Sequence, residues 1–183
     1  MDIKNYLLSV GALSKHIADG KVSESEADRL GKSDLWWVRK HNNTFYSGAI
    51  RQGDVFQFEF GKNLPPEMSY EHRGLVIGRS KQLLYVLPIF SYLPDKHDDL
   101  YSKTNQKGNQ YLLTSSNYPF LKHDSILKLN DMRSVSTKRI MYHQKDGYMD
   151  PASDAYKEIR ILSFSRIFPE YHYELMISRS KTS

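Results

Sequence analysis

The chain has 183 residues, which is enough for one well-buried globular domain with an extension but short for two full domains. It contains no cysteine, which excludes disulfides, thiolate zinc sites, iron–sulfur clusters and thiol nucleophiles and fits a cytoplasmic protein. Twenty-six Lys and Arg residues against 21 Asp and Glu residues give a net charge of +5, a mild excess that favours a polyanionic partner but is also common in proteins that bind none.

Residues 1–50 have the pattern of a helical N-terminal extension. Apolar residues recur at helical spacing across Met1–Ile17, which predicts one amphipathic helix. Ser23, with an acidic residue three positions later, fits a capping box that begins a second helix, and Gly31 is a typical end signal. Ser33 then begins a further short turn, so everything before residue 51 is expected to be helical.

The Trp36-Trp37 pair is the most prominent apolar feature of this extension. We expect it to pack the extension against the rest of the chain, and stacking on unpaired bases is the alternative. Six acidic residues nearly cancel seven basic ones before residue 51, so the extension is expected to be a packing or partner element. No membrane span and no secretory signal are expected, because the apolar runs are short and the N-terminus has no basic patch followed by an apolar stretch.

From residue 51 onward the pattern changes to short runs rich in aromatic and β-branched residues. These predicted strands are Asp54–Phe60, Arg73–Ile77, Leu83–Phe90, Gln110–Leu113 and Ser125–Leu129. In the first run, Phe56, Phe58 and Phe60 alternate with polar residues, which predicts a half-buried strand with the three rings in the core. Pro94–Gly108 is expected to be a polar loop. Short strands with such breaks predict a small curved antiparallel sheet or partly open barrel.

A C-terminal helix follows the predicted strands. Asp150-Pro151 is expected to cap it, a stripe made by Ala152, Ala155, Ile159 and Leu162 to face the core, and Pro169 to end it. The predicted fold class is therefore α+β, with residues 1–50 as a helical extension and residues 51–183 as the main domain.

Three segments carry a resemblance to a known family. They are Gly53-Asp54-Val55 running into Phe56–Phe60; Arg73–Ile77 followed by Leu84–Ser91; and Ser125–Leu127 followed by Asp131–Ser136 and Arg139-Ile140. In this order, over about residues 51–140, they resemble the MazF/PemK ribonuclease toxins of bacterial toxin–antitoxin systems.

The resemblance implies a fold and an activity. It implies an SH3-like curved antiparallel β-barrel with a C-terminal helix, acting as a homodimer in the bacterial cytoplasm. The implied activity is sequence-specific, metal-independent cleavage of single-stranded RNA by attack of the ribose 2′-hydroxyl on the adjacent phosphorus, with no cofactor. It also implies a cognate antitoxin protein that neutralises the enzyme.

Three residues are the catalytic candidates. The resemblance gives Arg73 the role of placing positive charge on the phosphoryl oxygens, and a guanidinium has the right fork of donors for it. Ser91 lies one position beyond the family's catalytic Thr or Ser, so it can serve only if the strand end directs it to the right face. His72 is the auxiliary candidate, because imidazole suits acid–base work. The alternatives are a surface cation for Arg73, a local hydrogen bond for Ser91 and an exposed loop histidine for His72.

Lys62, Lys81 and Arg133 are the candidate RNA-binding residues. Lys62 and Lys81 lie in turns next to the expected site, where lysines position phosphates, although most such lysines are simply solvated. Arg133 belongs to the third matching segment, and tying a loop through its donors is the alternative role.

No metal site is expected. The run His97-Asp98-Asp99 contains ligand types, but consecutive residues rarely converge on one ion. The rival to an endoribonuclease is a non-catalytic toxin or binding protein on the same fold, either like the gyrase-poisoning toxins or binding RNA without cutting it. Cleavage of a mixed-sequence RNA in EDTA separates the two.

Overall fold

The computed structural model describes residues 4–41, 45–64 and 67–170, and it divides the chain into two compact units, Met1–Asn42 and Asn43–Ser183. The first unit contains α1 (Lys4–Ala18) and α2 (Glu24–His41). The helix predicted over Met1–Ile17 is therefore present in α1, and its first three residues lie outside the described ones. None of the helices in the described ranges is both long and apolar enough to span a bilayer.

Helix α2 begins where the sequence predicts and continues past the predicted end. The Ser23 hydroxyl accepts a hydrogen bond from the Glu26 backbone N–H at 3.2 Å. Gly31 does not end the helix, so that prediction is wrong: the left-handed backbone that ends a helix is adopted by Gly20 (φ 69°), after α1. The Lys32–Asp28 ion pair, at 2.5 Å, joins the turns on either side of Gly31.

The boundary between the units falls before the sequence-based one. Residues 45–50 are not helical, contrary to prediction. Ile50 is buried, and Tyr46 packs edge-on to Phe56 at 5.6 Å between ring centroids. Their apolar side chains therefore join the core of the second unit.

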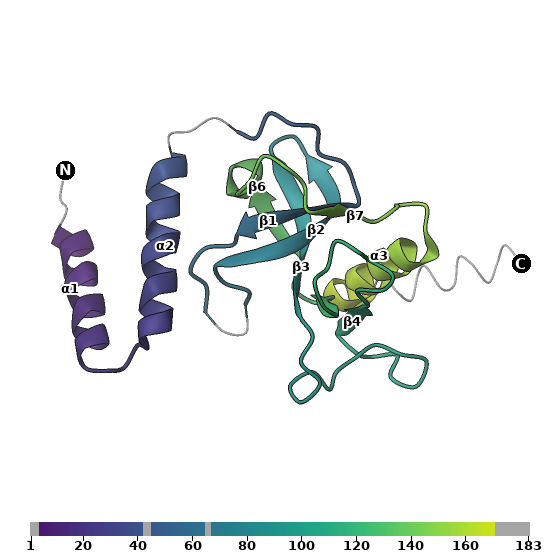
Figure 1. The fold of residues 1–183 in the computed structure, drawn as a ribbon, viewed down its shortest axis with the longest axis horizontal. Coiled ribbons are helices and arrows are strands. Elements are labelled where there is room, and N and C mark those ends of the chain that lie inside the picture. Colours follow the sequence, from purple (N-terminus) through teal and green to yellow (C-terminus); the bar gives the residue numbers. More distant parts are fainter. Residues whose placement is uncertain (1–3, 42–44, 65–66, 171–183) are drawn as a thin grey trace, which may run out of the picture. The chain divides into compact units, whose positions relative to one another are not determined.

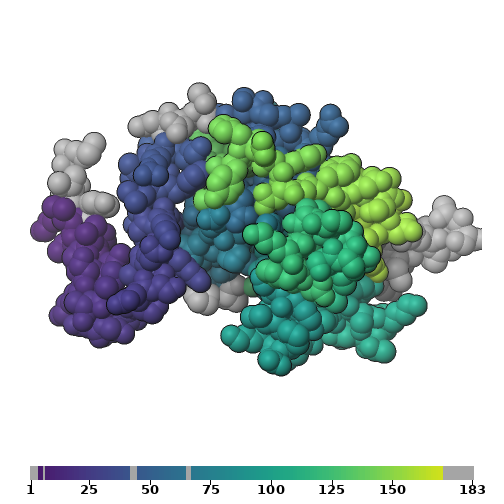
Figure 2. Space-filling view, viewed as in Figure 1, coloured from purple at the N-terminus to yellow at the C-terminus, as the bar shows by residue number. Residues whose placement is uncertain are grey.

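The second unit is built on a seven-stranded antiparallel sheet, so the α+β prediction is confirmed at this level (Figure 1). Its strands are β1 (Asp54–Glu59), β2 (Glu71–Ser80), β3 (Leu83–Ser91), β4 (Gln110–Leu113), β5 (Ser125–Lys128), β6 (Arg133–Ser136) and β7 (Gly147–Tyr148). The sheet order is β4-β5-β3-β2-β1-β7, and β6 pairs with β3 beside β5. The five predicted strands correspond to β1–β5, whereas β6 and β7 were not predicted. The chain between β3 and β5, coloured teal to green, contributes much of the visible surface of this unit (Figure 2).

Apolar side chains cover both faces of the central strands. One cluster contains Val55, Leu75 and Leu87, and the other contains Phe56, Phe58 and Val86. The prediction of a half-buried first strand is therefore wrong, although the three phenylalanines are core as predicted. With both faces covered along their middles, these strands can offer polar side chains to a ligand only near their ends.

Helix α3 (Asp154–Ile167) packs on the first of these clusters, near β4 (Figure 1). Its N-cap is Ser153, whose hydroxyl accepts from the Tyr156 N–H at 3.3 Å, and not Asp150-Pro151 as predicted. Asp150 instead closes the preceding turn by accepting from the Ala152 N–H at 2.9 Å. The helix ends at Phe168, before Pro169, as the sequence predicts.

Candidate functional site

The register of the central strands places several polar residues on one face. Arg73 in β2 lies opposite Gln57 in β1 and opposite Ile89 in β3. Ser91 is two residues beyond Ile89 and pairs with Ser125 in β5. Because side chains alternate along a strand, Arg73 and Ser91 lie on the same face. Ser91 therefore needs no bulge to reach the face of Arg73.

These strand ends form a pocket of about 180 Å³. It is lined by Gln57, Glu71, His72, Arg73, Ile89, Phe90, Ser91, His123 and Ser125. The three catalytic candidates Arg73, Ser91 and His72 are thus brought together. The pocket also contains two titratable residues that the sequence analysis did not select, Glu71 and His123.

Arg73 is held by an ion pair with Asp146. The Arg73 Nε donates to Asp146 Oδ2 at 2.7 Å, and each side chain retains about a quarter of its surface exposed. Asp146 lies just before β7, and its own N–H donates to the Val55 carbonyl, so the carboxylate is fixed to the sheet. This bond uses Nε and sets the plane of the guanidinium at the pocket wall.

Ser91 and His123 form a short polar contact in the pocket. Ser91 Oγ lies 2.7 Å from His123 Nε2, and both residues are exposed. The next residue, Asp124, accepts hydrogen bonds from the Ser115 N–H at 2.8 Å and the Ser115 hydroxyl at 3.0 Å. These bonds, together with the nearby charge of His123, lower the pKa of the Asp124 carboxyl. An ionised carboxylate is therefore fixed beside His123.

Glu71 brings negative charge to the same face. It is two residues from Arg73 in β2, its Oε1 accepts from Gln57 Nε2 at 3.0 Å, and the Tyr142 hydroxyl is 3.4 Å away. The charge of Glu71 is the main cause of a raised pKa at Tyr142. The pocket therefore contains an acidic oxygen near the guanidinium.

His72 reaches the pocket from the neighbouring strand position. It pairs with Phe58 across β1 and β2, and its side chain leaves the strand on the face opposite to that of Arg73. It nevertheless contributes to the lining and is partly buried.

The three predicted RNA-binding residues lie in different places. Lys62 is in the loop between β1 and β2, at the strand ends that form the pocket, because Glu59 pairs with Glu71 there. Lys81 is in the turn at the other end of β2, roughly 25 Å from Arg73 at about 3.3 Å per residue. The structure therefore places Lys62, but not Lys81, at the strand ends that form the site.

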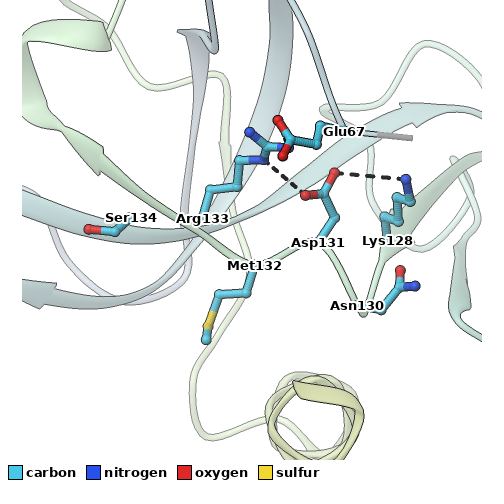
Figure 3. Close-up of a pocket in the computed structure, with 7 residues that line it drawn as sticks. All are labelled: Glu67, Lys128, Asn130, Asp131, Met132, Arg133 and Ser134. Carbon is cyan, nitrogen blue, oxygen red and sulfur yellow. Dashed lines mark hydrogen bonds and ion pairs between the residues drawn. The ribbon is translucent and has the colours of Figure 1, made fainter. Parts of the chain in front are cut away.

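Arg133 lines a second, larger pocket of about 490 Å³ (Figure 3). There its Nε donates to Asp131 Oδ1 at 2.9 Å, Glu67 lies 3.5 Å from its Nη2, and Lys128 lies 3.9 Å from Asp131. Figure 3 shows Arg133 and Lys128 both directed toward Asp131. Two carboxylates thus neutralise the two cations, so this pocket is less suited to a polyanion than its size suggests.

No group of three or more His, Asp or Glu side chains within the described ranges is arranged to hold a metal ion. In the run His97-Asp98-Asp99, the His97 Nδ1 accepts from the Leu93 N–H and Asp99 accepts from Asn109. These side chains support the loop after β3.

The sequence could not have identified His123, because its selection depends on the pairing of β5 with β3. The one available signal was its position two residues before a predicted strand.

In comparisons with known proteins, no family model and no curated sequence matches this chain.

Proposed function

We propose that this protein is a metal-independent endoribonuclease of the MazF/PemK type, which cleaves single-stranded RNA at the pocket of Arg73 and Ser91. The observation that carries the proposal is the convergence of Arg73, Ser91 and His72 in that pocket. The family resemblance points to Arg73 and to the position next to Ser91, and His72 is the residue beside Arg73 whose imidazole suits acid–base work. The antiparallel sheet with a C-terminal helix supports the SH3-like barrel that this proposal includes.

The size of the pocket favours part of a polymer as its ligand. Its volume of about 180 Å³ is below the range of about 300–1,000 Å³ in which proteins enclose drug-sized ligands. One phosphodiester with part of its ribose is a suitable occupant, and the neighbouring nucleotides then lie outside, on the side of Lys62.

Each candidate has a role in the proposed reaction. The Arg73 guanidinium stabilises the negative charge that develops on the phosphoryl oxygens when the 2′-hydroxyl attacks. The Ser91 hydroxyl contacts the reacting group from the same face. His72 serves as an auxiliary proton carrier at the edge of the pocket. The products are a 2′,3′-cyclic phosphate and a 5′-hydroxyl.

Arg73→Ala tests the proposal, with single-turnover cleavage of a mixed-sequence RNA in excess EDTA as the measurement. Loss of a donor that stabilises the transition state costs about a hundredfold to a thousandfold in rate, whereas one phosphate contact in a long footprint contributes modestly to affinity. Arg73→Lys should recover only part of the rate, because an ammonium keeps the charge without the planar fork.

Arg79→Ala is the matched control, because Arg79 is an exposed arginine on the same strand whose Nε donates to the Lys81 carbonyl. It should cleave at the parent rate. Parent-like cleavage by Arg73→Ala would refute the role of Arg73. RNA binding without cleavage by the parent protein would favour the non-catalytic rival, and cleavage that requires a divalent ion would refute the metal-independent mechanism.

The proposal extends to the partners that the resemblance implies. A homodimer in the bacterial cytoplasm and a cognate antitoxin protein belong to it. Light scattering of the purified chain tests the dimer, and relief of growth arrest by a co-expressed neighbouring gene tests the antitoxin.

A further inference from the structure

The Ser91–His123 contact joins the end of β3 to the segment just before β5. Ser91 ends β3, and His123 is two residues before β5, 32 positions later in the chain. Both side chains are exposed, so their contact adds little to the buried core. A short hydrogen bond between a hydroxyl and an imidazole, inside a pocket with an arginine, is an arrangement able to move a proton.

We propose that Ser91 and His123 form a proton relay that protonates the leaving 5′-oxygen, and that Glu71 is the base that accepts the 2′-hydroxyl proton. This inference rests on the proposed RNA cleavage and assigns its acid and base. Ser91 and Glu71 would touch the reacting atoms, whereas His123 supplies its proton through Ser91.

Charged groups of both signs lie around His123. Asp124, fixed by two hydrogen bonds from Ser115, carries a negative charge next to His123 in the chain. From β2, Glu71 adds a second negative charge, Arg73 a positive one and His72 a titratable ring. Among the lining residues, the negative charge of Glu71 and the positive charge of Arg73 cancel. A net positive charge that attracts an incoming phosphodiester therefore comes from a protonated histidine.

Glu71 is the base that the strand geometry favours. It lies on the face of Arg73 and Ser91, whereas His72 leaves the strand in the opposite direction. Its hydrogen bonds with Gln57 and Tyr142 both involve Oε1, so Oε2 can accept a proton without breaking either of them.

The proposed step balances without water or a co-reactant. The 2′-hydroxyl proton passes to Glu71 as the bond from O2′ to phosphorus forms. As the bond from phosphorus to O5′ breaks, the Ser91 hydroxyl gives its proton to O5′ and receives one from His123 Nε2. The products are the cyclic phosphate and the 5′-hydroxyl, with Glu71 protonated and His123 neutral until both exchange protons with solvent.

The test compares two RNA substrates that differ at the leaving atom. In the second, sulfur replaces the bridging 5′-oxygen at one site, and a thiolate leaves without protonation. His123→Ala and Ser91→Ala should each lose about a hundredfold or more on the normal RNA and cleave the sulfur substrate at nearly the parent rate. Glu71→Gln should be impaired on both substrates, because the base acts on the 2′-hydroxyl in each.

Two further measurements distinguish a relay from separate contributions. The double variant Ser91→Ala with His123→Ala should be no slower than either single variant, because each change breaks the same path. The parent rate on normal RNA should fall at high pH as the imidazolium loses its proton, and His123→Ala should lack that fall. His143→Gln, a change at an exposed histidine outside the pocket, and Glu170→Gln, a change at an exposed acid, are the controls and should behave as the parent.

The outcomes separate this inference from the proposed function. No cleavage by the parent protein refutes both. A parent that cleaves RNA, with His123→Ala equally impaired on both substrates, refutes the relay alone. Cleavage by Glu71→Gln at the parent rate refutes the role of Glu71 as the base. The relay is then judged from the comparison of the normal and sulfur substrates alone.

Discussion

Tyr156→Phe tests how α3 is held against the face of the sheet that carries Arg73. Tyr156 is fully buried, and its hydroxyl donates to the Val76 carbonyl of β2 at 3.2 Å. The same carbonyl also accepts from the Gly53 N–H at 2.8 Å, so it keeps a partner when the hydroxyl is removed. Burial raises the pKa of Tyr156 to about 12, against smaller opposing effects of Arg160 and the Gly53 backbone.

These observations give the expected free energies. At pH 7 the variant should lose about 1 kcal/mol of unfolding free energy, the usual net value of one hydrogen bond. A tyrosine in the unfolded chain ionises near pH 10, whereas buried Tyr156 stays neutral to about pH 12. Its contribution is thus complete below pH 10 and declines as the pH rises toward 12. The parent should lose about 1 kcal/mol from this residue by pH 11, and the variant loses nothing at this position.

The measurement is urea unfolding of both proteins between pH 7 and pH 11, at constant ionic strength. The parent should be more stable at pH 7, and the two curves should meet near pH 11. The remaining tyrosines are shared by both proteins, so their ionisation cancels in the difference. A difference between the two proteins that stays constant over this range would show that the Tyr156 hydroxyl is not buried as described.

Two other substitutions test the surroundings of Arg73. Gly74→Ala should lower the unfolding free energy by about 1–3 kcal/mol, because its Cβ would lie 2.3 Å from Val86 Cγ1 and 3.0 Å from Phe58 Cδ2, both in the core. Val86→Ala in the same chain should recover part of the loss in thermal unfolding, whereas an additive loss would contradict the close approach. Asp146→Ala should slow single-turnover cleavage about tenfold or more by releasing the Arg73 Nε, and Asp146→Asn should be less affected because its amide oxygen still accepts the bond. Weaker RNA binding at an unchanged rate would show that Asp146 does not position Arg73 for the reaction.

Local patterns in the sequence were sufficient to predict most of the strands. Alternation and aromatic content located β1–β5, because those signals depend on residues close in the chain. The strand β6 was missed because Arg133–Ser136 has one apolar residue, Val135, and forms a strand by pairing with Leu83–Val86. Gly147–Tyr148 is too short to carry a pattern and is defined by its partner Val55. These elements are consequences of tertiary pairing.

The same division applies to the candidate site. Arg73 and Ser91 were selected on a family resemblance and His72 on its chemistry beside Arg73, and the pairing of β2 with β3 brings Ser91 to the other two. The local signal for His123 was only its position two residues before a predicted strand, and its place in the pocket depends on β5 joining β3. Arg133 lies in the third segment that resembles the family. The loop between β1 and β2 brings Glu67 to it, and no sequence pattern predicted this contact.

The pairing of β3 with two successive strands has a consequence for the order in which the site forms. Strands β2 and β3 are joined by a tight turn, so the face with Arg73 and Ser91 can form early from residues close in the chain. His123 joins it only after the long chain segment following Ser91 has closed, at a larger entropic cost. Local opening of that segment would separate His123 from Ser91 while the hairpin stays folded. The assembled pocket is therefore a property of the closed segment, and the population of that closed state sets an upper limit on the fraction of molecules in which the proposed reaction can occur.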